Sequence, residues 1–154
     1  MAESTTSKKS FKGSCHCGFI TYTLAWDTAS DGDPKVFRCN CTWCQKPGYN
    51  ILKLENPEDF QLLTPASKDE MGDYAPRKAE VDGHRYFCKT CGTHIYREAK
   101  YTFNGQQHES FTVNALSIDQ PQEGIDLSEL SYSYCDGLTN KFTTGDKPFP
   151  GGAP

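Results

Sequence analysis

The chain has 154 residues, which suits one domain with its own hydrophobic core and is short for two full domains. Hydrophobic residues make up 36% of the sequence and aromatic residues 12%, so a core can form, while the mean hydropathy of -0.69 reflects long polar connections. The net charge of -4 and the pI near 5.5 argue against a nucleic-acid binder that works through clustered Lys and Arg.

The two ends of the chain differ from its middle in composition. Residues 1–10 are polar without periodicity and predict a flexible N-terminal arm, and residues 145–154 predict a flexible Pro/Gly-rich tail. A single domain is expected over residues 11–144. The sequence contains neither a signal-peptide pattern nor a membrane-spanning apolar run, which predicts a soluble, cytoplasmic protein with no membrane partner. In a reducing compartment the eight cysteines favour metal binding over disulfides.

Short runs of β-branched and aromatic residues recur along the middle of the chain and are separated by Gly, Pro, Asp and Asn. This pattern is typical of short antiparallel strands. A single helix start is indicated, at NPEDF, where Asn56 can cap and Pro57 suits the first helical position. The sequence therefore predicts a mainly β, single-domain fold with little helix, with strands near residues 19–24, 49–54, 84–88, 94–98, 110–118 and 130–135.

Four of the cysteines form two pairs that suit one structural zinc ion. Cys88 and Cys91 lie in a C-x-x-C turn followed by Gly, which lets two sulfurs converge. Cys15 and Cys17 alternate with His16, so a strand here would present both sulfurs on the same face. Local disulfides or a redox pair are the alternatives, but C-x-C is awkward to bridge and a redox C-x-x-C needs a βαβ context.

Three further cysteines lie within six positions, at Cys39, Cys41 and Cys44, and predict a second zinc site. The fourth ligand is open at this point: Cys135, a histidine, water or a substrate. Three thiolates give a zinc centre a formal charge of -1, which suits hydrolysis poorly and suits a thiol substrate well. If Cys135 closes the site, both zinc ions are structural and the protein has no metal chemistry.

Other side chains near the cysteines are weaker candidates. Aromatic side chains beside zinc loops either shield the metal or wall a pocket, and basic ones can pair with the carboxylates of a peptide ligand. The best-placed histidine is His94, which we expect to act as a hydrogen-bonding neighbour of the first site rather than as a ligand. The aromatic candidates are Trp43, Tyr49, Phe87 and Tyr96, and the basic candidates are Lys46, Arg85 and Lys89.

Three blocks of the sequence contain the paired and grouped cysteines: GSCHCG, CNCTWCQKPGY and RYFCKTCGTHIY, and the block NALSIDQP follows them. Together these blocks resemble the signature of the glutathione-dependent formaldehyde-activating enzyme family, which includes centromere protein V relatives. The likeness covers roughly residues 11–120. It implies a β-tent fold, a structural zinc on the first four cysteines, and a catalytic zinc near a glutathione pocket on Cys39, Cys41 and Cys44.

The family's activity joins glutathione to formaldehyde, so the resemblance implies a carbon-sulfur lyase that produces S-hydroxymethylglutathione. Departures after Cys44, among them Tyr49, and a loosely matching C-terminal part keep two alternatives open. One is a specialised enzyme for a larger thiol, with Trp43 and Tyr49 in its pocket. The other is a zinc-binding interaction module without catalysis.

Overall fold

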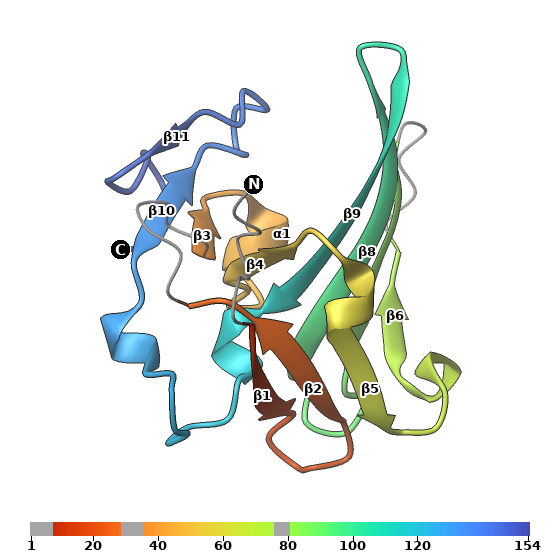
Figure 1. The fold of residues 1–154 in the computed structure, drawn as a ribbon. Helices are drawn as coiled ribbons and strands as arrows, with labels where there is room; N and C mark the ends of the chain where they lie inside the picture. Colours follow the sequence, from red (N-terminus) through yellow and green to blue (C-terminus); the bar gives the residue numbers. More distant parts are fainter. Residues whose placement is uncertain (1–7, 29–35, 76–80) are drawn as a thin grey trace, which may run out of the picture.

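The computed structural model describes residues 8–28, 36–75 and 81–154, and eleven strands form two sheets in this part of the chain (Figure 1). The smaller sheet has the order β1-β2-β5 and the larger has the order β11-β10-β3-β4-β9-β8-β7-β6. The strands are β1 (Lys9–Ser14), β2 (Thr21–Trp26), β3 (Val36–Cys39), β4 (Ile51–Leu54), β5 (Phe60–Thr64), β6 (Gly72–Tyr74), β7 (Val81–Phe87), β8 (His94–Phe103), β9 (Gln106–Asn114), β10 (Tyr132–Cys135) and β11 (Thr144–Gly145).

The mainly β fold expected from the sequence is confirmed, and each of the six expected strands is present, with shifted ends. The ladders are antiparallel except for β10, which pairs with β3 in parallel. This parallel pair aligns Cys135 with Cys39 across the sheet. Strands β1, β3, β5, β6 and β11 escaped prediction because they are short or polar on one face.

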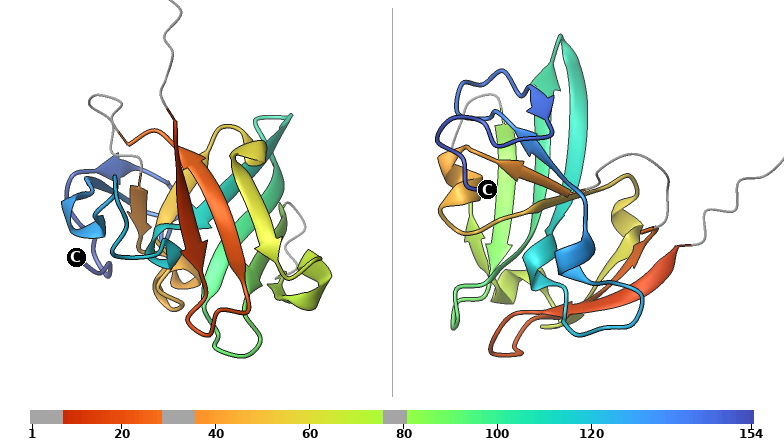
Figure 2. Two further views of the ribbon diagram at one scale, coloured as in Figure 1. Left: turned by 60° about the horizontal axis from the view of Figure 1, so that its bottom comes forward. Right: turned by 90° about the vertical axis from the view of Figure 1, so that its left-hand side faces the viewer.

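The core lies where the smaller sheet crosses one end of the larger sheet, as Figure 2 shows. An aromatic series connects the two sheets. The ring of Phe60 lies 4.9 Å from that of Tyr22 in the smaller sheet and 4.7 Å from that of Tyr96 in the larger sheet. Burial of apolar surface is the main contribution to the stability of this core. The offset and tilted ring pairs add a preferred packing geometry to it.

Helix is scarce, as predicted, and mostly consists of single 3₁₀ turns. At the NPEDF segment Asn56 accepts a hydrogen bond from the Glu58 N–H at the start of η1, so the predicted turn is confirmed. Helix α1, in the second cysteine loop, was not predicted because it is one turn long and has no side-chain cap. The helical segments are α1 (Thr42–Gln45), η1 (Pro57–Asp59), η2 (Lys68–Glu70), η3 (Ala115–Ser117) and η4 (Leu127–Glu129).

Among the described residues, none of these helices is long and apolar enough to cross a membrane.

Candidate metal centres and the neighbouring pocket

The first cysteine cluster comprises Cys15, Cys17, Cys88 and Cys91, whose sulfurs all lie within 4.8 Å of one another. The Cys17 sulfur is 3.6 Å from those of both Cys15 and Cys88. Zinc-sulfur bonds of about 2.3 Å in a tetrahedron place sulfurs about 3.8 Å apart, so this cluster fits a zinc ion. It joins the β1-β2 connection to the β7-β8 connection, which lie side by side at the bottom of Figure 1.

The expected strand geometry for Cys15 and Cys17 is wrong. β1 ends at Ser14, and both cysteines lie in a turn that the hydrogen bond from the Gly18 N–H to the Cys15 carbonyl closes. Gly18 has a φ of 82°, a conformation that glycine adopts without steric cost, so the turn reverses within a few residues. The two sulfurs converge as predicted, but a tight turn is the reason.

Hydrogen bonds from outside the first cluster reach two of its sulfurs. The Ile20 N–H donates to the Cys15 sulfur at 3.2 Å. At Cys91 burial opposes ionisation, but hydrogen bonds from the Thr93 hydroxyl and backbone outweigh burial and lower the pKa to about 5. Metal ligation requires deprotonated thiols, which the lowered pKa of Cys91 favours. At Cys17, in contrast, a backbone hydrogen bond is outweighed by hydrogen bonding with neighbouring thiols and by desolvation, which raise the pKa to about 11.

The second cluster comprises Cys39, Cys41 and Cys44, and its three sulfurs also lie within 4.8 Å of one another. Cys39 is the last residue of β3, Cys41 precedes α1, and the helical turn returns Cys44 towards them. The Gln45 N–H donates to the Cys41 carbonyl at 2.9 Å and closes this turn. One short loop therefore supplies all three sulfurs, which matches the predicted grouping.

Negative charge in the second cluster concentrates on Cys39. Hydrogen bonds from the Cys41 and Cys44 thiols, together with backbone N–H groups of Cys41 and Gly137, lower the pKa of Cys39 to about 2. Because the Cys41 and Cys44 thiols donate these hydrogen bonds to Cys39, their own pKa values are raised. A Cβ atom at Gly137 would lie 2.5 Å from the Cys39 sulfur, so only glycine allows the backbone to approach the cluster this closely.

Cys135 lies beside the second cluster but outside the group of three sulfurs that could share an ion. It is the parallel-strand partner of Cys39. Burial, the negative charge on Cys39 and a hydrogen bond with the Cys39 sulfur raise the pKa of Cys135 to about 11. Only the position of its sulfur separates Cys135 from the three candidate ligands.

Arg85, predicted as a possible contact for substrate carboxylates, is 1% exposed and lies behind the second cluster. Its guanidinium stacks between the rings of Trp43 and Tyr49, at 4.2 and 4.4 Å from their centroids. It donates to the Trp43 carbonyl, and a second nitrogen lies 3.7 Å from the Cys44 sulfur. Arg85 therefore compensates the charge of the thiolates from inside the protein.

The remaining predicted candidates divide between two faces of α1. Tyr49 is buried, donates to the Thr112 carbonyl at 2.9 Å, and lines the pocket that contains Cys39 and Cys44. On the other face, a broad cavity of about 620 Å³ is lined by Trp43, Lys46, Phe87 and His94 among others. Trp43 and Tyr49 therefore do not share one pocket.

His94 lies in that second cavity and not among the sulfurs. Its Nδ1 atom is buried and has no hydrogen-bond partner among the described residues. Burial and the charge of Arg85 lower the pKa of His94, so the ring is neutral at neutral pH. The expected hydrogen bond to the first cluster is not formed by this nitrogen. Lys89, the other predicted basic candidate, is exposed, and Tyr96 belongs to the core.

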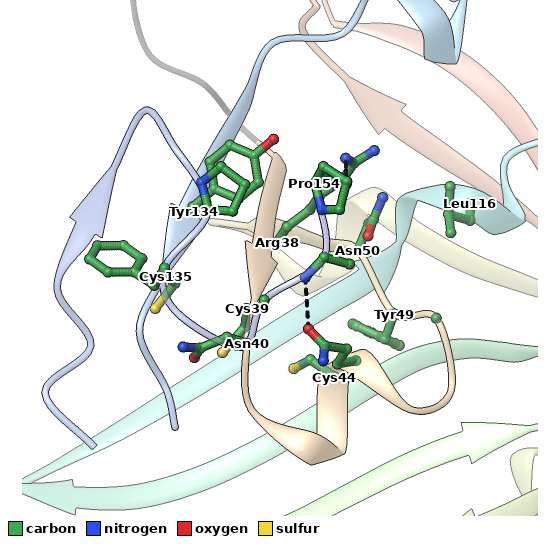
Figure 3. A pocket seen from close by; sticks show the side chains of 16 residues that line it. Arg38, Cys39, Asn40, Cys44, Tyr49, Asn50, Leu116, Tyr134, Cys135 and Pro154 are labelled. Carbon is green, nitrogen blue, oxygen red and sulfur yellow. Dashed lines mark hydrogen bonds between the residues drawn. The ribbon is translucent and has the colours of Figure 1, made fainter. Parts of the chain in front are cut away.

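A smaller cavity of about 180 Å³ opens beside Cys39, Cys44 and Cys135 (Figure 3). Arg38, Gln45 and residues of the C-terminal tail up to Pro154 also line it. None of these was predicted, because the tail carries no motif and reaches the cavity only through the fold. The single sequence signal was the position of Arg38 and Gln45 directly beside two cysteines.

No curated protein matches this chain by sequence. The model of the glutathione-dependent formaldehyde-activating enzyme family, in contrast, matches residues 10–130, which is most of the chain and includes both cysteine clusters. The blocks that carried the resemblance lie within this match. The chain belongs to the glutathione-dependent formaldehyde-activating enzyme family.

Proposed function

We propose that the protein is a zinc-dependent carbon-sulfur lyase that joins glutathione to a small carbonyl electrophile of the formaldehyde type, or runs the reverse step. The observation that carries this proposal is the convergence of the Cys39, Cys41 and Cys44 sulfurs, with Cys39 and Cys44 at the wall of a cavity and Cys135 outside the group of three. Four cysteines at the first cluster suit a closed structural site, whereas three at the second suit a site that also receives a ligand.

In this proposal Cys39, Cys41 and Cys44 hold the ion, and the cavity receives the substrate thiol. A zinc ion held by these three sulfurs would supply a soft Lewis acid, which favours the deprotonated form of a substrate thiol at neutral pH. In the synthetic direction the sulfur-carbon bond forms, the carbonyl π bond breaks, and the thiol proton ends on the new hydroxyl group. Arg85 offsets part of the accumulated negative charge, and the cavity holds the two reactants together.

The test combines metal analysis with turnover. We expect two zinc ions per wild-type chain and accelerated formation of S-hydroxymethylglutathione, followed by NMR after mixing glutathione with formaldehyde. Cys41→Ser should retain one zinc and a folded core but lose the acceleration. Lys100→Ser, which changes an exposed side chain that pairs with Glu109 at 3.6 Å, is the control. Full acceleration in a Cys39/Cys41/Cys44 triple Ser variant would refute the proposal.

A further inference from the structure

Residues 148–154, called the C-terminal strap here, cover the cavity beside the second cysteine cluster. Pro148, Phe149, Gly152, Ala153 and Pro154 form one of its walls. Figure 3 shows the end of the strap at Pro154 running past Arg38 and above Cys44. The strap thus lies where a substrate would have to enter to bring its sulfur to Cys39 and Cys44.

The cysteine loop binds the strap through the strap's main chain. Gln45 uses both halves of its side-chain amide: its nitrogen donates to the Gly151 carbonyl at 2.9 Å, and its oxygen accepts from the Ala153 N–H at 3.0 Å. The Asn40 side chain donates to the Pro150 carbonyl at 3.2 Å, and Arg38 donates to the Pro154 carbonyl. These contacts recognise a peptide backbone rather than particular side chains.

The same side chains are adjacent to the sulfur ligands in the sequence. Asn40 lies between Cys39 and Cys41, and Gln45 follows Cys44. A peptide held by Asn40 and Gln45 is therefore placed close to the sulfurs. Glutathione is a thiol with two amide linkages and terminal carboxylates, so it offers the groups that the strap offers. The guanidinium of Arg38, stacked 4.1 Å from the Tyr132 ring centroid, suits a carboxylate at the end of such a ligand.

The strap and a tripeptide cannot occupy the cavity together. With the strap in place the cavity measures about 180 Å³, whereas ligand clefts usually measure about 300–1,000 Å³. Few hydrogen bonds hold the strap to the cysteine loop, and a ligand that offers the same amide groups can replace each of them.

We propose that Gln45, Arg38 and Asn40 form a cradle for the peptide part of the thiol substrate, and that the C-terminal strap competes with the substrate for this cradle. This inference rests on the proposed function and adds to it the residues that select a peptide thiol. The strap must leave when substrate binds, so it lowers the affinity for thiols that lack peptide groups to displace it.

Three variants separate the cradle from the strap. In Gly152→Val, the added Cβ would lie 3.0 Å from the Phe149 carbonyl oxygen and 3.1 Å from the Asn40 Cβ, so the strap should move away from Asn40 while all three cradle side chains are retained. Gln45→Leu loosens the strap and also removes part of the cradle. Gly145→Ala is the control, because its Cβ would meet Phe149 only at an ordinary 3.5 Å.

The probe is S-methylglutathione, which keeps the peptide groups and cannot add to an aldehyde. We expect its dissociation constant to fall about threefold to tenfold in Gly152→Val and to rise by a similar factor in Gln45→Leu, the equivalent of one hydrogen bond each. Gly145→Ala should match the wild type. Hydrogen exchange at the Ala153 amide should accelerate when the probe binds the wild-type protein. If Gly152→Val fails to fold, truncation after Lys147 replaces it.

Opposite changes in the dissociation constant of S-methylglutathione in Gly152→Val and Gln45→Leu support the inference. A purely structural role of these residues would move both dissociation constants in the same direction. The inference is overturned, with the proposed function intact, if formaldehyde addition to glutathione proceeds while the Ala153 amide stays protected and Gly152→Val binds the probe like the wild type. If the wild type and all variants neither bind glutathione nor accelerate the addition, the proposed function fails and the inference fails with it.

Discussion

Arg85 is the residue whose role changes most between sequence and structure. In the sequence it is a basic side chain three positions before Cys88, suitable for a substrate carboxylate. In the fold it is buried between two aromatic rings and its charge faces Cys44. A planar guanidinium can stack and donate at the same time, which an ammonium group cannot do.

Replacing Arg85 should therefore damage stability and the second metal site together. We expect Arg85→Met to lower the free energy of unfolding by about 3 kcal/mol, because the Trp43 carbonyl loses its donor and the Cys44 thiolate loses its buried counter-charge. Denaturant unfolding and zinc content measure the two effects. Lys100→Met should change neither, and an Arg85→Met protein with wild-type stability and two zinc ions would contradict this role.

The position of Cys135 predicts how many zinc ions remain when this residue is replaced. Because it lies outside the group formed by Cys39, Cys41 and Cys44, Cys135→Ser should leave the second metal in place. We expect two zinc ions per chain by mass spectrometry under native conditions, against one for Cys44→Ser. A single zinc in Cys135→Ser would make Cys135 the fourth ligand and would favour two structural sites.

At the scale of elements, the short strand β6 is attached to β7 by a histidine bridge. His84 on β7 lies 2.7 Å from Asp73 on β6 and 3.2 Å from Asp82 on its own strand. The hydrogen bond to Asp73, helped by the charges of both carboxylates, outweighs burial and raises the pKa of His84 above 6.5. The protonated ring holds the two strands together more strongly than the neutral ring.

The sign of the pH dependence follows from this raised pKa. The stabilisation by His84 should be fully present below the unfolded pKa of 6.5 and should be lost as pH rises through the higher folded pKa. Because the pair is partly exposed, it contributes at most about 1 kcal/mol. The difference in melting temperature between wild type and His84→Gln should shrink from about pH 6 to about pH 9. A difference that grows with pH would contradict the assignment.

At the scale of the whole molecule, the first cysteine cluster connects the two sheets. Cys17 and Cys88 are 71 residues apart in sequence, and each belongs to a connection in a different sheet. Closing such a long loop is entropically costly, and a metal bound only in the folded state stabilises that closure. The second cluster lies within one loop and closes no comparable loop.

Metal loss from the two clusters should therefore have different consequences. We expect Cys88→Ser, or full chelation, to abolish the cooperative thermal transition. Cys44→Ser should keep a cooperative transition, with circular dichroism close to that of the wild type. Equal losses in both variants would show that the second ion also supports the whole fold.

The sequence alone determined the two cysteine groups that could hold metal ions and the mainly β fold, because both follow from residue types at short spacings, which act through local geometry. Only the tertiary structure decided what surrounds the second group. Arg85, Gly137 and the strap reach it from segments about 40 to 115 residues away, and their positions depend on strand pairing and sheet packing rather than on any local pattern. For the same reason, the burial of Arg85 and the cradle formed by Arg38 and Gln45 could be found only in the folded chain.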